Sequence, residues 1–242
     1  MDVQTVFKRL KHSFLHLVFP PRCLHCEEST DHDQPLFCPA CLSLLELIDP
    51  SERCFSCFGP RDPAQGRRCS DCLEGNSIFS GIGAAFDYIG PAASLIKKLK
   101  YGNQPYLAEG AGAFLVAQWG QLKWPVPDAI VPIPLSFTHW IDRGYNQTVL
   151  LAEQMSKLLE VPVWDVLHRK SGDYSQAALS LSQRKSLDGK RFTLKKKFSL
   201  EDKTLLLVDD VMTSGSTLKR CAEVLVEGYP TRLYALAFCK AV

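Results

Sequence analysis

The sequence lacks a long apolar run, a strong excess of one charge and a recognisable export signal. No stretch is apolar enough to cross a bilayer, which excludes a transmembrane helix. The net charge is +2 at pH 7, so overall electrostatics do not indicate a nucleic-acid or membrane partner. The apolar run near the start is short, is interrupted by His16 and precedes no small-residue cleavage site. We therefore expect a cytoplasmic protein.

Cysteine is scarce after residue 72, where only Cys221 and Cys239 occur, in apolar patterns typical of buried thiols. The other eight cysteines form four Cys-x-x-Cys pairs in two copies of the pattern C-x2-C-x11-C-x2-C, 31 residues apart. This spacing is an internal repeat. The eight positions are Cys23, Cys26, Cys38, Cys41, Cys54, Cys57, Cys69 and Cys72.

These pairs favour metal over disulfides, because two such turns complete a tetrahedral thiolate site for Zn²⁺. Disulfides would need an oxidising compartment. We expect two structural zinc ions. Three groupings of the four pairs are open. In the consecutive grouping, which we favour, the first pair shares an ion with the second and the third with the fourth. The crossed grouping joins the first pair with the third and the second with the fourth, and the nested grouping joins the two outer pairs and the two inner pairs. The segment has too little apolar sequence for its own core, so its folding would depend on the ions.

The chain divides into three expected parts. Residues 1–21 have apolar side chains at helical spacing and predict a short amphipathic helix. Residues 22–75 contain the cysteine repeat, and residues 76–242 form the larger part. Within 168–197 there are nine basic and two acidic residues, typical of a solvated face or an anion-binding flap.

In the larger part, strand and helix patterns alternate. The patterns predict strands at 82–89, 128–134, 161–167, 204–210 and 232–239, and helices at 91–100, 106–122, 146–160 and 217–228. Such alternation predicts right-handed βαβ units and an α/β fold with a mostly parallel sheet flanked by helices. Ligands of such sheets bind beyond the carboxyl ends of the strands.

The run LLLVDDVMTSGSTL ends a predicted strand with two carboxylates, Asp209 and Asp210. The loop 211–216 then leads into a helix, whose free N–H groups and positive end favour an anion. Hydroxyl side chains and a glycine suit a phosphate cradle there: Thr213, Ser214, Gly215, Ser216 and Thr217. The spacing of a P-loop is absent. Since the carboxylates would repel phosphate, they suit ribose hydroxyls, with Mg²⁺ as an alternative partner.

This stretch resembles the phosphoribosyl pyrophosphate (PRPP) signature of type I phosphoribosyltransferases. Together with DAIVPIPLS, RGYNQ and QAALSLSQRKSL behind the cysteine repeat, the chain resembles the ComF family of bacterial competence proteins and its gluconate-linked relatives. The resemblance covers nearly the whole chain. It implies a double zinc ribbon in front of a type I phosphoribosyltransferase-like domain.

The resemblance also implies roles for single residues. Asp209 and Asp210 would hold the ribose hydroxyls, and residues 213–217 the 5-phosphate. The pyrophosphate loop would be Pro132, Ile133, Pro134, Leu135 and Ser136, binding chiefly through its backbone. Arg143, Asn146 and Gln147 match the motif that follows this loop, and Gln176 and Arg184 match a covering segment. Arg143 and Arg184 would also bind PRPP. The run FTHWID departs from the family, which usually has basic residues there.

We therefore expect a PRPP-binding protein of DNA uptake, with Mg²⁺ bound together with PRPP and pyrophosphate as the leaving group of a transfer reaction. The alternative is a non-enzymatic accessory that binds single-stranded DNA or a competence helicase through the ribbons and the basic segment 168–197. In that case PRPP would be a regulatory ligand, or the site degenerate. The sequence carries no pattern that specifies an acceptor or an oligomeric state.

Overall fold

The computed structural model describes residues 21–30, 36–62, 64, 66–72, 77–170, 192–195 and 198–241. The helix expected within 1–21 and the covering segment with Gln176 and Arg184 lie outside these residues. Within the described part of the chain, no helix has the length and apolar character needed to span a membrane.

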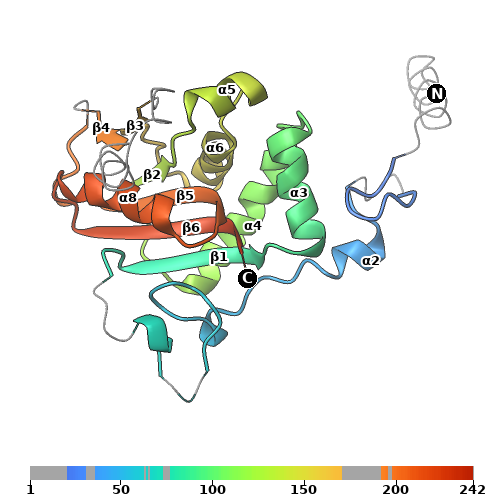
Figure 1. The fold of residues 1–242 in the computed structure, drawn as a ribbon, viewed down its shortest axis with the longest axis horizontal. Coiled ribbons are helices and arrows are strands. Elements are labelled where there is room, and N and C mark those ends of the chain that lie inside the picture. The colour runs from blue at the N-terminus through green and yellow to red at the C-terminus, as the bar shows by residue number, and fades with distance from the viewer. Residues whose placement is uncertain are drawn as a thin grey trace, which may run out of the picture.

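A four-stranded sheet is the centre of the larger part (Figure 1). Its strands are β1 (Gly81–Asp87), β2 (Ala129–Pro132), β5 (Thr204–Met212) and β6 (Arg232–Lys240), in the order β1-β6-β5-β2. All three neighbouring pairs are parallel, with Val208 of β5 opposite Pro132 of β2. The predicted parallel α/β sheet is confirmed. Two short strands, β3 (Leu167–Arg169) and β4 (Phe192–Leu194), form a separate antiparallel pair.

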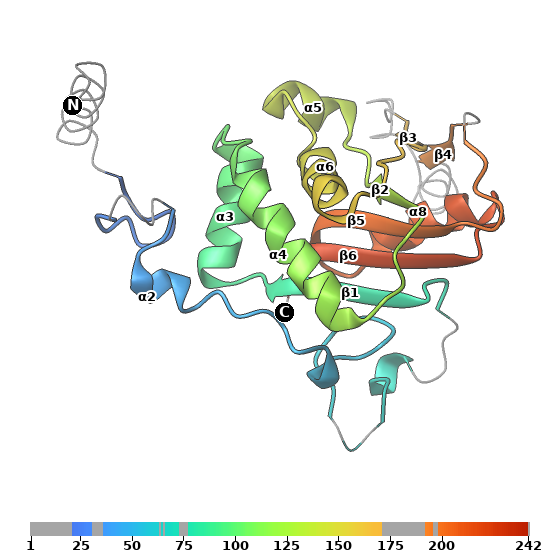
Figure 2. The same ribbon diagram turned by 180° about the vertical axis from the view of Figure 1, so that it is seen from behind.

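Helices cover both faces of this sheet. Figure 2 shows α3 (Gly90–Tyr101), α4 (Leu107–Leu122) and α6 (Gln147–Leu159) on one face, and Figure 1 shows α8 (Ser216–Val226) on the other. The connection between β2 and α6 contains α5 (Phe137–Arg143). The described residues of the cysteine segment include α2 (Pro39–Leu42) and the 3-10 turns η1 (Pro50–Glu52) and η3 (Ser70–Cys72).

Alternation along β5 divides the core into two layers. Leu206 and Val208 pack in the cluster that contains the buried residues of α3, α4 and α6. Leu205 and Leu207 pack in the cluster that contains the buried residues of α8. Successive side chains of a strand point to opposite faces. The side chain of Asp209 therefore lies on the face of the sheet that α8 covers, and the side chain of Asp210 lies on the face that α6 covers.

The segment before the larger part covers the free edge of the sheet. The backbone N–H of Ile48 donates to the carbonyl of Ala85 in β1 at 2.9 Å. The carbonyl of Ile48 accepts from Nε2 of Gln118, in α4, at 2.9 Å. Since β1 is an edge strand, this contact removes part of an unpaired backbone edge. The division into residues 1–21, 22–75 and 76–242 stays a prediction.

The strand predicted at 161–167 is wrong. This segment forms a single parallel bridge, Val163 to Ile130, and the strand β3 begins only at Leu167. Pro162 has no backbone N–H to donate to a ladder, although its carbonyl accepts from Ile130 N–H at 2.9 Å. The apolar residues therefore pack beside β2 without a regular strand.

Candidate functional site

The two aspartates lie within β5, as the predicted strand 204–210 had them, but the strand continues beyond them. The strand extends to Met212, and α8 begins at Ser216, so the loop between them is residues 213–215 rather than the predicted 211–216. Asp210 is 5 % exposed, whereas Asp209 is partly exposed. Desolvation, followed by the negative charge of Asp210, raises the pKa of Asp209 to about 7.

Protein donors occupy both carboxylate oxygens of Asp210. Lys100 Nζ, at the end of α3, lies 2.7 Å from Oδ1, and the two side chains are 16 % and 6 % exposed. Gln147 Nε2, in the first turn of α6, donates to Oδ2. Arg143 Nη1 donates to Oε1 of Gln147 at 3.0 Å, and its guanidinium lies 4.9 Å from the ring centroid of Tyr101. We call these five residues the Asp210 network.

The sequence analysis had identified Gln147 but not Lys100. Three lysines occur in α3, at positions 97, 98 and 100. Lys100 lies four residues after Ile96, which is fully buried, so it is on the inward face of the helix. This four-residue spacing from an apolar position is the sequence feature that could have indicated an inward-facing lysine.

The motif RGYNQ connects the proline-rich loop to α6. Asn146 caps α6, because its side-chain Oδ1 accepts from Thr148 N–H at 3.1 Å. Asn146 Nδ2 and Thr148 Oγ1 both donate to the carbonyl of Ile133, at 3.1 and 2.7 Å. The N–H of Ile133 donates to the carbonyl of Val208 at 3.0 Å. The loop after β2 is therefore held beside β5, just before the two aspartates.

The loop between β5 and α8 is the place of the predicted phosphate cradle. Gly215 has φ +73°, a left-handed conformation that L side chains rarely adopt, and it is the N-cap of α8. Thr213, Ser214 and Ser216 are exposed. Lys240 Nζ, at the end of β6, donates to the carbonyl of Thr213 at 2.9 Å, so a cation lies beside the loop.

Among the described residues, those expected to bind PRPP line different cavities. Ser214, Gly215 and Ser216 line a cavity of about 380 Å³. Pro134 and Leu135 line one of about 280 Å³, together with Asn146. Arg143 lines one of about 580 Å³, together with Lys100. Ser136 caps α5, accepting from the N–H of His139. Arg184 lies outside the described residues.

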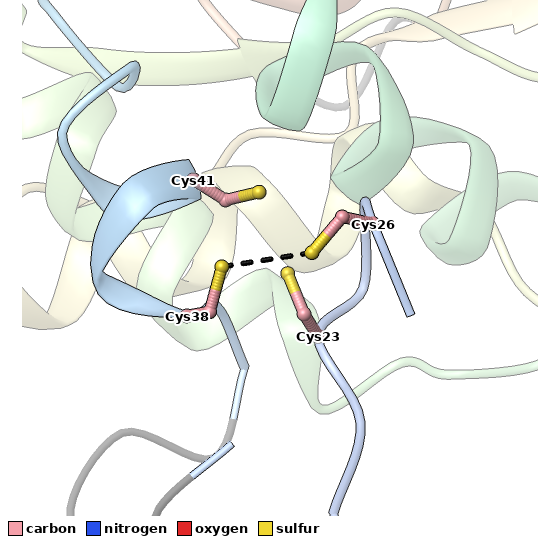
Figure 3. Close-up of side chains that lie close together, drawn as sticks. All are labelled: Cys23, Cys26, Cys38 and Cys41. Atoms are coloured by element: carbon pink, nitrogen blue, oxygen red, sulfur yellow. Dashed lines mark hydrogen bonds between the residues drawn. The ribbon is translucent and has the colours of Figure 1, made fainter. Parts of the chain in front are cut away.

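The eight paired cysteines form two groups in the consecutive grouping. Within each group all sulfur atoms lie within 4.8 Å of one another. Figure 3 shows the first group, in which the side chains from two short segments converge. The two groups are Cys23, Cys26, Cys38 and Cys41, and Cys54, Cys57, Cys69 and Cys72.

The distances within the groups fit zinc. A tetrahedral site with Zn–S bonds of about 2.3 Å has neighbouring sulfurs about 3.8 Å apart. Cys26 and Cys38 are 3.6 Å apart, and Cys57 and Cys69 are 3.8 Å apart. Burial opposes ionisation of Cys23, but backbone N–H donors outweigh it and lower its pKa to about 6. A balance of the same kind lowers the pKa of Cys54 to about 6. Burial raises the pKa of Cys41 and Cys72 in the same two groups, so the argument for zinc rests on the sulfur geometry. Both clusters are consistent with structural zinc ions.

Two family profiles match parts of the chain. The profile described as "Double zinc ribbon domain" matches residues 14–73. The profile described as "Phosphoribosyl transferase domain" matches residues 146–241, which include β5, its aspartates and α8. The second profile supports the fold that the resemblance implied.

The similarities to solved structures are more distant. A glutamine PRPP amidotransferase from Bacillus subtilis is 15 % identical, with a TM-score of 0.42 over 59 % of this chain and 30 % of that one. A purine phosphoribosyltransferase from Pyrococcus horikoshii is 14 % identical, with a TM-score of 0.36 over 55 % of this chain and 82 % of that one. Both likenesses are weak.

Curated relatives match over most of their length. "Competence protein F" of Haemophilus influenzae is 29 % identical over 84 % of this chain and 90 % of that protein. "DNA utilization protein YhgH" of Escherichia coli is 28 % identical over 72 % of this chain and 78 % of that protein. "Competence protein ComFC" of Bacillus subtilis is 33 % identical over 85 % and 88 %. With a double zinc ribbon, a phosphoribosyltransferase domain and these relatives, the chain belongs to the ComF family of competence proteins.

Proposed function

We propose that this protein binds PRPP together with Mg²⁺ at the carboxyl ends of β2 and β5, and acts in DNA uptake or utilisation. The observation that carries the proposal is the cradle at Gly215, directly after the aspartates of β5. An anion site next to carboxylates suits a phosphorylated sugar, because its phosphate and its hydroxyls need opposite partners. The names of the curated relatives support the biological process.

In this proposal the 5-phosphate binds residues 213–217, at the N-terminus of α8. The ribose hydroxyls face the aspartate pair of β5. The pyrophosphate lies towards the loop after β2, residues 132–136, with Arg143 and Arg184 as the cations that the family resemblance assigns. Bound Mg²⁺ neutralises the charge on the pyrophosphate and ribose oxygens.

The chemistry that this arrangement permits is transfer of the ribose 5-phosphate group. The bond between C1 and the pyrophosphate oxygen breaks, its electron pair leaves with pyrophosphate, and a nucleophile forms a new bond to C1. Positive charge develops on C1 and the ring oxygen, so nearby carboxylates stabilise it. The protein contributes mainly by holding the sugar and the pyrophosphate in place.

Two structural zinc ions would hold the cysteine segment. That segment buries few apolar side chains of its own, so the metal supplies folding free energy. We place the protein in the cytoplasm, where thiols stay reduced and available to zinc.

A docking role for the basic segment 168–197 is the second candidate. One described residue of that segment, Lys195, already pairs with Asp165, which reduces the charge available for DNA or for a helicase. If DNA affinity were the function, charge reversal at Lys195–Lys197 would abolish it, and binding would weaken steeply with salt.

The proposal is tested by thermal unfolding of the zinc-loaded protein with and without PRPP and Mg²⁺. A bound ligand raises the melting temperature in a concentration-dependent way. The informative variant is Ser216→Asp in the first turn of α8. A carboxylate there is compatible with the helix dipole, so the fold should persist, but it repels a phosphate.

We expect PRPP to raise the melting temperature of the wild type and to leave the melting temperature of Ser216→Asp unchanged. Ser43→Asp, at an exposed position of the cysteine segment, is the matched control and should respond as the wild type does. Equal stabilisation of Ser216→Asp and the wild type would contradict the proposed phosphate site.

A further inference from the structure

The two adjacent aspartates of β5 have very different surroundings. Asp210 is buried, with one oxygen 2.7 Å from Lys100 Nζ and the other accepting from Gln147. Asp209 is partly exposed, and the hydrogen bond found for its carboxylate among the described residues is from the N–H of Asp210, at 2.9 Å. Among the described residues, the protein therefore provides two side-chain donors for the carboxylate of Asp210 and one backbone donor for that of Asp209.

Moving Asp210 towards a ligand would disrupt its neighbours. Lys100 is only 16 % exposed, so the loss of its partner would leave a buried ammonium without a counter-charge. Breaking such a pair from one side is strongly destabilising. The amide of Gln147 would lose its acceptor too, while its Oε1 stays bound to Arg143 at 3.0 Å.

The Asp210 network also joins four elements of the site. Lys100 and Tyr101 end α3, Gln147 begins α6, and Asp210 lies near the end of β5. Arg143 is the last residue of α5, and its guanidinium packs over Tyr101. A fixed carboxylate at the centre of these contacts sets the position of β5, and with it the position of Asp209.

We propose that the two aspartates have separate tasks. Asp209 is the carboxylate that accepts hydrogen bonds from the ribose hydroxyls, and Asp210 is a positioning residue, held by Lys100 and Gln147, that does not touch the sugar. This inference rests on the proposed PRPP site and deepens it.

The first experiment compares two sugars that differ by one hydroxyl. Ribose 5-phosphate and 2-deoxyribose 5-phosphate are titrated calorimetrically into the zinc-loaded wild type, Asp209→Asn and Asp210→Asn. A hydrogen bond from a ligand hydroxyl to a charged carboxylate corresponds to about a tenfold difference in affinity. We expect the wild type to prefer ribose 5-phosphate by about that factor.

The ratio of the two affinities distinguishes the aspartates. Asp209→Asn should bring the ratio close to one. Asp210→Asn should weaken the binding of both sugars by a common factor and keep the ratio of the two affinities. The reason is that this substitution disturbs the position of Asp209 but does not remove its contact with the hydroxyl. The inference would be overturned if Asp210→Asn lost the preference for ribose 5-phosphate while Asp209→Asn kept it. It would also be overturned if both variants lost this preference equally.

The second experiment tests the positioning role without any ligand. Denaturant unfolding is measured for Lys100→Met, Asp210→Asn, the double variant, and Lys100→Arg. Lys100→Met should lower the unfolding midpoint more than the double variant does, since it leaves a buried carboxylate alone. Lys100→Arg should restore most of the midpoint. Additive effects of the two single substitutions would contradict the pairing.

The two experiments separate this inference from the proposed function. If the wild type binds neither PRPP nor ribose 5-phosphate, the proposed function fails, and the assignment of Asp209 fails with it. The unfolding measurements do not depend on PRPP, so they decide the role of Lys100 independently.

Discussion

Arg53 Nη2 lies 2.7 Å from Oδ2 of Asp87, which joins the second cysteine group to the end of β1. The two side chains are 12 % and 24 % exposed. The N-terminal part of the chain is therefore attached to the sheet by an ion pair that is mostly withdrawn from water, in addition to the backbone contact of Ile48 with β1.

We expect Arg53→Met to lower the free energy of unfolding by about 1–3 kcal/mol, because Asp87 then remains without its partner. Denaturant unfolding measures this change. Lys203→Met is the matched control. Lys203 pairs with Asp128 at 3.5 Å, but both side chains are 42 % exposed, so its loss should change stability by less than about 0.5 kcal/mol. Equal effects of the two substitutions would contradict this account of Arg53.

The metal content follows from the two cysteine groups. Metal analysis of the purified wild type should give two zinc ions per chain. Cys26→Ser and Cys57→Ser should each reduce the content by about one ion, because each removes one of four sulfur ligands. Cys221→Ala, in α8 and outside both groups, should retain two. A loss of both ions from a single substitution would mean that the groups are not independent.

The close approach of α4 and α6 predicts opposite effects at two glycines of one helix. A Cβ at Gly112 would lie 2.4 Å from the Cβ of Gln154, whereas a Cβ at Gly110 meets nothing within 4 Å. Gly112→Ala should destabilise the protein by about 1–3 kcal/mol through overpacking. Gly110→Ala should stabilise it by up to about 1 kcal/mol, because alanine is the better helix former. Thermal unfolding compares them, and a stabilising Gly112→Ala would refute the packing.

The raised pKa of Asp209 predicts how stability changes with pH in the absence of PRPP and Mg²⁺. Desolvation and Asp210 raise this pKa from 3.8 to about 7 in the folded protein. Between these values the folded state holds a proton that the unfolded state has lost. The contribution is therefore favourable below about pH 4 and is lost as the pH rises to about 7.

Asp209→Asn should therefore be more stable than the wild type at pH 8, by roughly 1–3 kcal/mol, since the partly exposed carboxylate is also screened by water. At pH 4 the difference should disappear. Unfolding midpoints at both pH values provide the measurement, with Glu201→Gln at an exposed position as control. A constant difference at both pH values would show that ionisation is not the cause.

The strand β5 and the helix α8 could be predicted from the sequence because local patterns specify them. An apolar run followed by small hydroxyl residues and Gly215 indicates a strand, a turn and a helix start. The predicted helices at 91–100 and 106–122 also agree with α3 and α4 to within about two residues.

The features that sequence reasoning missed depend on tertiary contacts. Helix α5 has only seven residues and none of them is buried, so its apolar pattern is too short to distinguish a helix from a loop. The segment 161–167 is apolar, but Pro162 and its place beside β2 prevent a regular strand. The contact between Lys100 and Asp210 joins residues 110 positions apart, and no local pattern of charges specifies it.

The most direct test of the central claim is calorimetric titration of the purified, zinc-loaded protein with PRPP in the presence of Mg²⁺. The double variant Asp209→Asn/Asp210→Asn is the control, because it removes both charges of β5 and leaves the cradle at Gly215. We predict binding in the micromolar range for the wild type and its loss in the double variant. No binding to the wild type, or equal binding to both proteins, would contradict the account.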